Sequence, residues 1–167
     1  MGRSAMRRKG LPVIGGALLA LASCAFGQEQ SASLRLAKEA SRAYAAFESA
    51  HFAFAAGDRE ELGQKLLRLG FDSGKKFMIG AKAGKVTAQD IRENMPLVFH
   101  LLNTGPNEDF VLGRIFEAAK EDCDKMQEEA RKPFADGSFR TDEDVRRLMN
   151  DELRKRNAEL LLPEKDE

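Results

Sequence analysis

The sequence predicts an all-α protein, a small bundle of about five helices that follows a cleaved signal peptide. Three observations lead to this prediction. Beyond residue 30, apolar residues recur every three or four positions, which is the period of a helix packed on one side. No stretch alternates apolar and polar residues as a half-buried strand would. Glycine, proline and capping residues divide the 167-residue chain into segments of helical length.

The N-terminal 30 residues have the layout of a secretory signal peptide. Arg3, Arg7, Arg8 and Lys9 precede an apolar run over 11–22, after which small residues lead into a polar segment. A basic start, a short apolar middle and a small-residue exit are the three parts of such a leader. The apolar run is shorter than the roughly 18–20 residues that a permanent membrane-spanning helix needs. We therefore expect a bacterial protein that is exported to the periplasm.

Two cleavage positions compete within this leader. Small residues at 25 and 27 favour a cut before Gln28 by a general signal peptidase. The stretch 21–24 (LASC) resembles a bacterial lipobox, in which Cys24 is acylated and becomes the first residue. Several acyl chains on one residue hold a protein stably on a membrane. Cys24 is therefore the candidate lipidation site, and the two cuts stay open as alternatives.

The predicted organisation has three parts. They are a leader over 1–27, or 1–23 in a lipoprotein, a helical core over 28–140, and a charged C-terminal helix and tail over 141–167. The whole chain balances 27 basic against 27 acidic residues, and the leader holds four basic residues and no acidic one. The mature chain therefore has four more acidic than basic residues. This balance excludes a typical nucleic-acid-binding protein, which carries a basic excess on one face.

The segment 31–56 is predicted as the first helix, because one apolar stripe runs through it. Its members are Ala37, Ala40, Tyr44, Phe47, His51 and Phe54. Gly57 ends this helix, and Asp58 with Glu61 is expected to form a capping box that opens the next one.

The second helix is predicted to run to about residue 81. Three glycines on one face of it, Gly63, Gly70 and Gly74, indicate close approach of another helix backbone. The alanines of the first helix are expected to lie in that smooth groove. These are Ala43, Ala46, Ala50 and Ala53.

Shorter helices are predicted next. Thr87 and Asp90 have the spacing of a helix start, and Asn94 is expected to cap a helix over 95–103 with Pro96 in its first turn. The turn at 103–109 (NTGPNED) then separates two helices.

Two longer helices complete the prediction. The first runs from Asn107 to about residue 131, with an apolar stripe made of Leu112, Phe116, Ala119, Cys123 and Met126. A loop over 132–140 leads to the second, which begins at Thr141 and ends before Pro163. Its narrow stripe consists of Val145, Met149 and Leu153, and is expected to pack at an edge of the bundle or to bind a partner.

No catalytic motif is present. The stretch 80–87 (GAKAGKVT) has one residue too few before its Gly-Lys pair for a phosphate-binding loop, and a valine follows the lysine. The chain has no Gly-x-Ser-x-Gly nucleophile motif and no Cys-x-x-Cys-His haem motif. We therefore predict no catalytic residue, no cofactor and no metal ligand. His51 and His100 are expected to be buried or half-buried imidazoles with one hydrogen bond each, and Cys123 to be a small core residue.

One polar surface is the candidate for binding. It consists of His100, Asn103, Asn107, Asp109 and Arg114, around the turn between two apolar helices. The preferred function is a non-enzymatic binding or interaction protein of the cell envelope, whose partner is another envelope protein or a small ligand. One alternative is a small envelope enzyme that uses His51, His100 and carboxylates, with or without a metal. The other is a structural lipoprotein that tethers a helical domain to the membrane through Cys24.

Overall fold

The computed structural model describes the backbone of residues 16–102 and 105–162, and the side chains of residues 32–102, 105–158 and 160–162. Within these ranges the chain forms helices and no strand, which confirms the all-α prediction. The elements are α1 (Gly16–Ala56), α2 (Glu60–Lys82), α3 (Ala88–Asn94), α4 (Leu97–Leu102), α5 (Glu108–Ala118), α6 (Glu121–Ala130), α7 (Asp142–Lys155) and the 3₁₀ turn η1 (Ala158–Leu161). None of the helices described here combines the length and the apolar character that crossing a membrane requires.

The predicted leader falls largely outside the described residues. Residues 1–15 are not described, and residues 16–31 are described only as backbone of α1, so Cys24 and both cleavage positions lie outside the described side chains.

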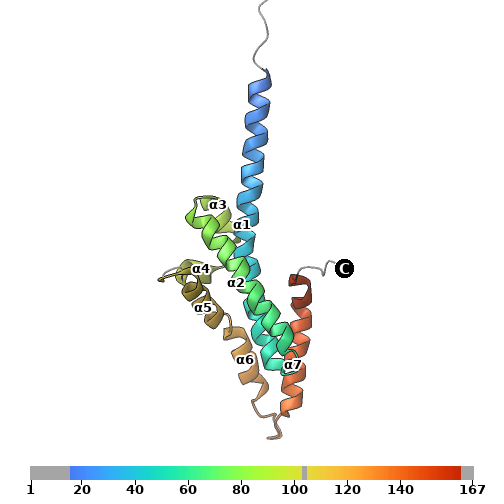
Figure 1. The fold of residues 1–167 in the computed structure, drawn as a ribbon. Coiled ribbons are helices and arrows are strands. Elements are labelled where there is room, and N and C mark those ends of the chain that lie inside the picture. The colour runs from blue at the N-terminus through green and yellow to red at the C-terminus, as the bar shows by residue number, and fades with distance from the viewer. Residues whose placement is uncertain (1–15, 103–104, 163–167) are drawn as a thin grey trace, which may run out of the picture.

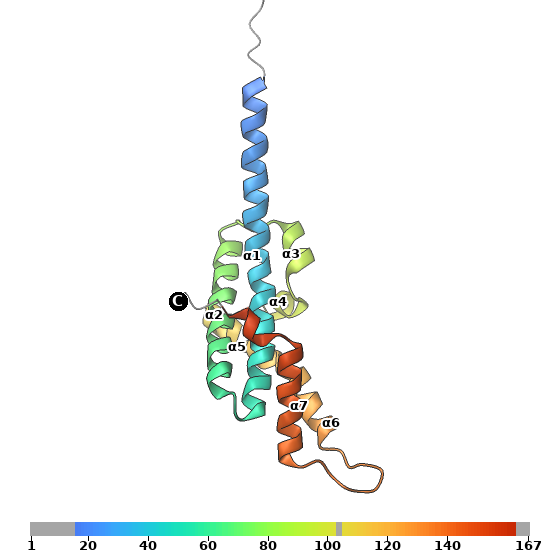
Figure 2. The same cartoon turned by 90° about the vertical axis from the view of Figure 1, so that its right-hand side faces the viewer.

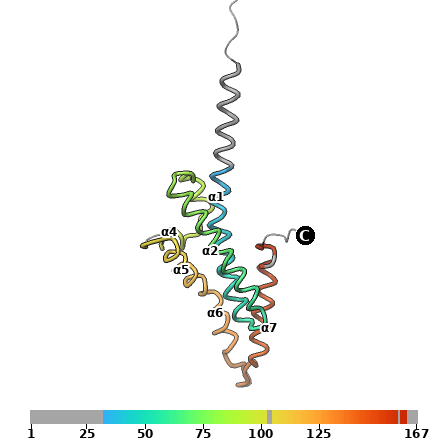
Figure 3. The backbone as a smooth tube through the Cα atoms, in the orientation of Figure 1, coloured from blue at the N-terminus to red at the C-terminus, as the bar shows by residue number. Residues whose placement is uncertain are grey.

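The helices are arranged around an antiparallel pair. The α1–α2 pair runs through the centre of Figure 1, with α4, α5 and α6 on one side of it and α7 on the other. Figure 2, turned by 90°, places α3 beside α1 on the side away from α2. The tube in Figure 3 follows the chain along α1, back along α2, forward again through α5 and α6, and back along α7.

The turn between α1 and α2 differs from the prediction in one respect. Gly57 ends α1 as expected, with a φ of +79° that a glycine adopts without strain. The residue that precedes α2 is Arg59, and it makes no side-chain cap. Asp58 is instead engaged with α7, because its Oδ1 accepts a hydrogen bond of 3.0 Å from Nδ2 of Asn150. The predicted capping box of Asp58 and Glu61 is therefore wrong.

The glycines of α2 do receive α1, but large side chains fill the groove. A Cβ at Gly63 would lie 2.5 Å from the ring of Phe54, and one at Gly70 would overlap the ring of Phe47. Farther along α2, Gly80 has the same relation to Leu36. Gly74 faces α5, where a Cβ would overlap Leu112. The alanines of α1 are buried as expected, yet the contacts that require glycine come from the aromatic and leucine side chains.

The buried side chains form two clusters along the bundle. One gathers Phe47, Phe77 and Phe99 with the buried residues of α5. The other contains Phe52 and Leu66 together with Met149 and Leu153 of α7. The stripe predicted for the last helix, from Val145 to Leu153, is thus buried against α1 and belongs to the core.

The start of α3 is as predicted. Oγ1 of Thr87 accepts a hydrogen bond of 3.1 Å from the Asp90 amide. Asp90 is buried, and its Oδ2 accepts hydrogen bonds from the hydroxyls of Ser33 at 2.5 Å and Thr87 at 2.7 Å. These donors favour the charged carboxylate, so they hold the pKa of Asp90 below its ordinary value. Asp90 therefore joins α3 to Ser33 of α1.

The start of α4 is not as predicted. Asn94 is the last residue of α3, and its Nδ2 donates a hydrogen bond of 3.1 Å to the Asp90 carbonyl. Met95 is extended, with φ −88° and ψ +126°, as steric contact with a following proline favours. The helix accordingly begins after Pro96, at Leu97, and Asn94 does not cap it.

The helix predicted over 107–131 is broken at Ala119 and Lys120. In an unbroken helix, the Phe116 carbonyl would accept the Lys120 amide. Here it accepts the Ala119 amide at 3.1 Å and lies 2.8 Å from Nε2 of His51. A proton on Nε2 makes His51 the donor in that contact. The partner on α1 thus replaces a helical bond and separates α5 from α6.

Candidate functional site

The residues predicted as a binding surface have mixed roles. Asn107 caps α5, because its Oδ1 accepts a hydrogen bond of 2.9 Å from the Phe110 amide. Asp109 lies 2.7 Å from Nζ of Lys75 on α2. Arg114 is exposed on α5, and Asn103 lies outside the described residues. Asn107 therefore stabilises the start of α5, and Asp109 joins α5 to α2.

His100 is exposed on α4, so the expectation of a buried or half-buried imidazole is wrong for this residue. The expectation holds for His51, which is half-buried and stacks on Phe116 with ring centroids 4.1 Å apart. Its ring nitrogen contacts the Phe116 carbonyl, as described above. The two histidines thus differ in role, since His51 joins α1 to the α5–α6 break and His100 faces solvent.

Large apolar side chains are exposed on the helix that carries His100 and on its neighbours. Leu97 is 70% exposed and Leu101 is 69% exposed, and both share the outward face of α4 with His100. Phe110 at the start of α5 and Ile79 on α2 are also exposed. These four apolar residues and His100 are called the α4–α5 surface below.

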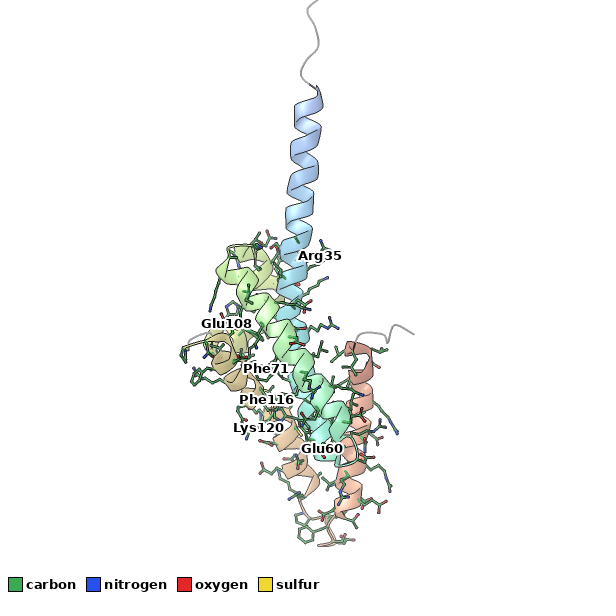
Figure 4. The ribbon with its side chains drawn as sticks, viewed as in Figure 1. Arg35, Glu60, Phe71, Glu108, Phe116 and Lys120 are labelled. Carbon is green, nitrogen blue, oxygen red and sulfur yellow. The ribbon has the colours of Figure 1, made fainter. Side chains whose placement is uncertain are left out.

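Ile79 lies on α2 between two lysines that form ion pairs with the start of α5. Lys82, one turn after Ile79, lies 2.5 Å from Glu108, and Lys75, one turn before it, pairs with Asp109. Ile79 therefore faces the first turn of α5, and the label of Glu108 in Figure 4 marks that point. Isolated exposed apolar residues are ordinary on soluble proteins, whereas a group of them indicates an interaction site.

Cys123 is buried, as predicted, and Nε2 of Gln127 donates to its sulfur at 3.4 Å. Burial raises the pKa of the Cys123 thiol, so the unreactive protonated form is favoured. Among the side chains that the structure describes, no three His, Cys, Asp or Glu residues come together in a group that would hold a metal ion.

A cluster of charges joins three helices. The guanidinium of Arg156, after the end of α7, lies 3.4 Å from Glu48 on α1, 3.7 Å from Asp122 on α6 and 3.3 Å from Glu152 on α7. It also covers the ring of Phe52 at 4.5 Å. Burial raises the pKa of Glu48, and the Arg156 charge opposes that rise. The cluster therefore joins the end of α7 to the start of α6 and to α1.

An open groove lies between α6 and α7. It consists of two hollows, of about 640 Å³ and about 400 Å³, which share Arg140, Leu148 and Asp151 as lining residues. Met126 and Ala130 of α6 line the larger hollow, and two phenylalanines of the α6–α7 loop, Phe134 and Phe139, line the smaller one. The seven residues named in this paragraph are called the α6–α7 groove.

The turn of the α6–α7 loop positions the two phenylalanines. The Gly137 amide donates to the Phe134 carbonyl at 2.9 Å, and the Phe134 amide donates to the Ser138 carbonyl at 2.8 Å. Gly137 has a φ of +80°, which suits a glycine in a tight turn. Phe134 and Phe139 thus stand on either side of this turn, and both remain exposed.

Sequence reasoning missed both sets of apolar residues, although each left a signal. The α4 sequence LVFHLL is apolar on nearly every side, so a helix of six residues at the surface must expose some of it. The loop KPFADGSFR places two phenylalanines around an Asp-Gly turn, where solvent-exposed residues are usual.

Comparison with protein-family models, curated proteins and solved structures finds no match to this chain.

Proposed function

We propose that this chain is an exported, non-enzymatic binding protein of the bacterial cell envelope, and that its α4–α5 surface contacts another envelope protein. The observation that carries the proposal is the outward apolar face of α4, with Leu97 and Leu101 each about 70% exposed. Burying one large apolar side chain of this kind in a complex contributes about 1.5–3 kcal/mol. The leader pattern over 1–27 supports export.

A site-specific cross-link tests this proposal. The photoreactive residue p-benzoylphenylalanine is placed at Leu101 in living bacterial cells, and adducts are collected from the fractionated envelope. We expect a discrete adduct with one envelope protein. Leu97→Asp in the same chain should remove most of it, because a charge in an apolar contact costs more than about 1.4 kcal/mol, or tenfold in affinity.

The matched control is the same photoreactive residue at Leu160, which is 81% exposed on η1. Equal adducts from positions 101 and 160, or an adduct that Leu97→Asp leaves unchanged, would show that the α4–α5 surface is not the contact. A protein that keeps Met1 and stays in the cytoplasm would overturn the envelope assignment.

The lipobox-like stretch 21–24 favours a second candidate function, a structural lipoprotein that tethers the bundle to a membrane. Cys24→Ser removes the acyl acceptor, so the protein should move from the membrane fraction to the soluble periplasm. In the unsubstituted protein, the N-terminal peptide should begin with a modified Cys24, which mass spectrometry would detect. Residue Gln28 at the N-terminus, or a Cys24→Ser variant that stays membrane-bound, would remove this candidate.

A further inference from the structure

The α6–α7 groove differs from the α4–α5 surface in having both apolar and charged lining residues around a hollow. Met126, Ala130 and Leu148 line the larger hollow, and Phe134 and Phe139 add apolar side chains from the loop. Aromatic residues in a pocket next to arginine are typical of positions that dominate binding energy. The groove therefore has the composition of a docking site for a protein segment.

The carboxylates along the groove are already paired within the chain. Asp151 lies 3.6 Å from Arg154, and Glu129 pairs with Lys132. Glu152 has both Lys155 and Arg156 as partners. These acidic side chains therefore present little uncompensated negative charge to a ligand.

The basic side chains along the groove also have ion-pair partners within the chain, with one exception. Arg147 lies 3.6 Å from Glu143 and 4.0 Å from Asp144. Arg140 instead covers the ring of Phe134 at 4.7 Å and donates to the Ala130 carbonyl at 3.2 Å.

Arg140 therefore differs from the other charged side chains of the two hollows, each of which has an ion-pair partner. Within residues 32–102, 105–158 and 160–162, no carboxylate comes within ion-pair distance of this half-buried guanidinium. Asp144 acts on it only over a longer range and is itself engaged by the Thr141 amide and hydroxyl. Because Arg140 lines both hollows, its remaining N–H donors are placed to receive an anionic group at the middle of the groove.

The walls of the groove favour a helical occupant. Both walls of the larger hollow are helices, whose backbone groups are bonded internally, and the described part of the chain offers no strand edge. An extended peptide would find no row of backbone partners here, whereas a helix satisfies its own backbone and packs its side chains between α6 and α7.

We propose that the α6–α7 groove binds an amphipathic helix of a partner protein, which places apolar side chains on Met126, Ala130 and Leu148 and a carboxylate on Arg140. The arrangement would add a third helix to the α6–α7 pair, with Phe134 and Phe139 as anchors at the loop end. This inference concerns a different surface from the α4–α5 contact and does not depend on it.

Peptides of defined sequence test the groove directly. A phage-displayed library of random 16-residue peptides is selected on the purified full chain. The strongest binder is then synthesised with Glu, and separately with Gln, at its conserved acidic position. We expect selected peptides that combine helical apolar spacing with an acidic residue and that become helical on binding, as followed by circular dichroism.

The variants separate charge recognition from structure. Arg140→Gln should weaken binding of the Glu peptide at least tenfold and leave the Gln peptide nearly unchanged, whereas Arg140→Lys, which keeps the charge, should restore part of the loss. Arg147→Gln is the matched control, because that arginine lines the same groove but already has carboxylate partners, and it should change affinity less than twofold. Leu148→Asp should abolish binding of both peptides.

Several results would overturn the inference. They are selected peptides without acidic residues, equal losses of the Glu and Gln peptides on Arg140→Gln, and binding that survives Leu148→Asp. Self-association of the full chain that Leu148→Asp abolishes would make a second copy the occupant and also overturn it. A failed cross-link at position 101 would affect only the proposed function, and a failed peptide selection only the groove.

Discussion

Phe47→Ala is expected to lower the free energy of unfolding by about 3–5 kcal/mol, the cost of truncating a fully buried phenylalanine. Phe47 is completely inaccessible to solvent. Its ring packs edge-on against Phe71 of α2, with centroids 5.4 Å apart, and against Phe116 of α5, at 5.5 Å. Figure 4 labels these two neighbours on the flank where α2 and α5 meet. One ring therefore links three helices, and its loss leaves a cavity that all three border.

Urea unfolding followed by circular dichroism would measure this change. Phe139→Ala is the control, because that ring is 65% exposed and its removal should change stability by less than about 0.5 kcal/mol. If Phe47→Ala unfolds the chain completely, Phe47→Leu gives a measurable loss of smaller size. A loss below about 1 kcal/mol for Phe47→Ala would mean that this ring does not organise the core.

The position of Phe47 in the core was predictable. A regular apolar stripe runs through 31–56, and the apolar face of a helix packs against the core. Local signals also located several helix ends. Gly57 ends α1, and Thr87, Asn107 and Thr141 cap α3, α5 and α7. Each of these signals acts within about one turn of the chain, so the sequence displays it directly.

Two of the failed predictions have a different cause, a partner that is remote in the sequence. Asp58 does not cap α2 because its hydrogen-bond partner, Asn150, is 92 residues away in the sequence. The helix over 107–131 breaks because His51, 65 residues before Phe116, contacts the Phe116 carbonyl. Partners so remote in the sequence are fixed by the packing of the whole bundle, which periodicity and capping rules do not describe.

The candidate site shows the same difference between features set by local sequence and features set by the packing of the bundle. Polar residues between two apolar helices indicated the region 100–114, but Asn107 and Asp109 proved to hold α5 in place. The exposed face of α4 adjoins them, and its exposure depends on where α2 and α5 lie. The α6–α7 groove is formed by the packing of two separate helices. Its residues can be read in the sequence, but the hollow between the helices cannot be predicted from it.

Gly70→Ala is expected to destabilise the protein by about 1–3 kcal/mol, although alanine is the better helix former. On intrinsic propensity alone, the substitution would stabilise α2 by about 0.8–1.0 kcal/mol. The added methyl group would overlap the ring of Phe47, and that ring is fully buried with Phe71 and Phe116 packed against it, which limits its movement. The overlap therefore has to outweigh the gain in helix propensity.

Gly113→Ala is the matched control for this prediction. Gly113 lies inside α5, and a Cβ there would meet no atom within 4 Å. With no contact to oppose it, the propensity gain should appear as a stabilisation of about 0.5–1 kcal/mol. Opposite signs for the two glycine substitutions, measured by the same urea titration, would separate packing from propensity.

A double-mutant cycle identifies the contact that causes the loss. In the Phe47→Ala background the opposing ring is absent, so Gly70→Ala should change sign and stabilise the protein by about 0.5–1 kcal/mol. A methyl group at position 70 would then partly fill the cavity that the missing ring leaves. If Gly70→Ala is equally destabilising in both backgrounds, the overlap is with the α1 backbone, and the glycines of α2 serve helix approach as the sequence first indicated.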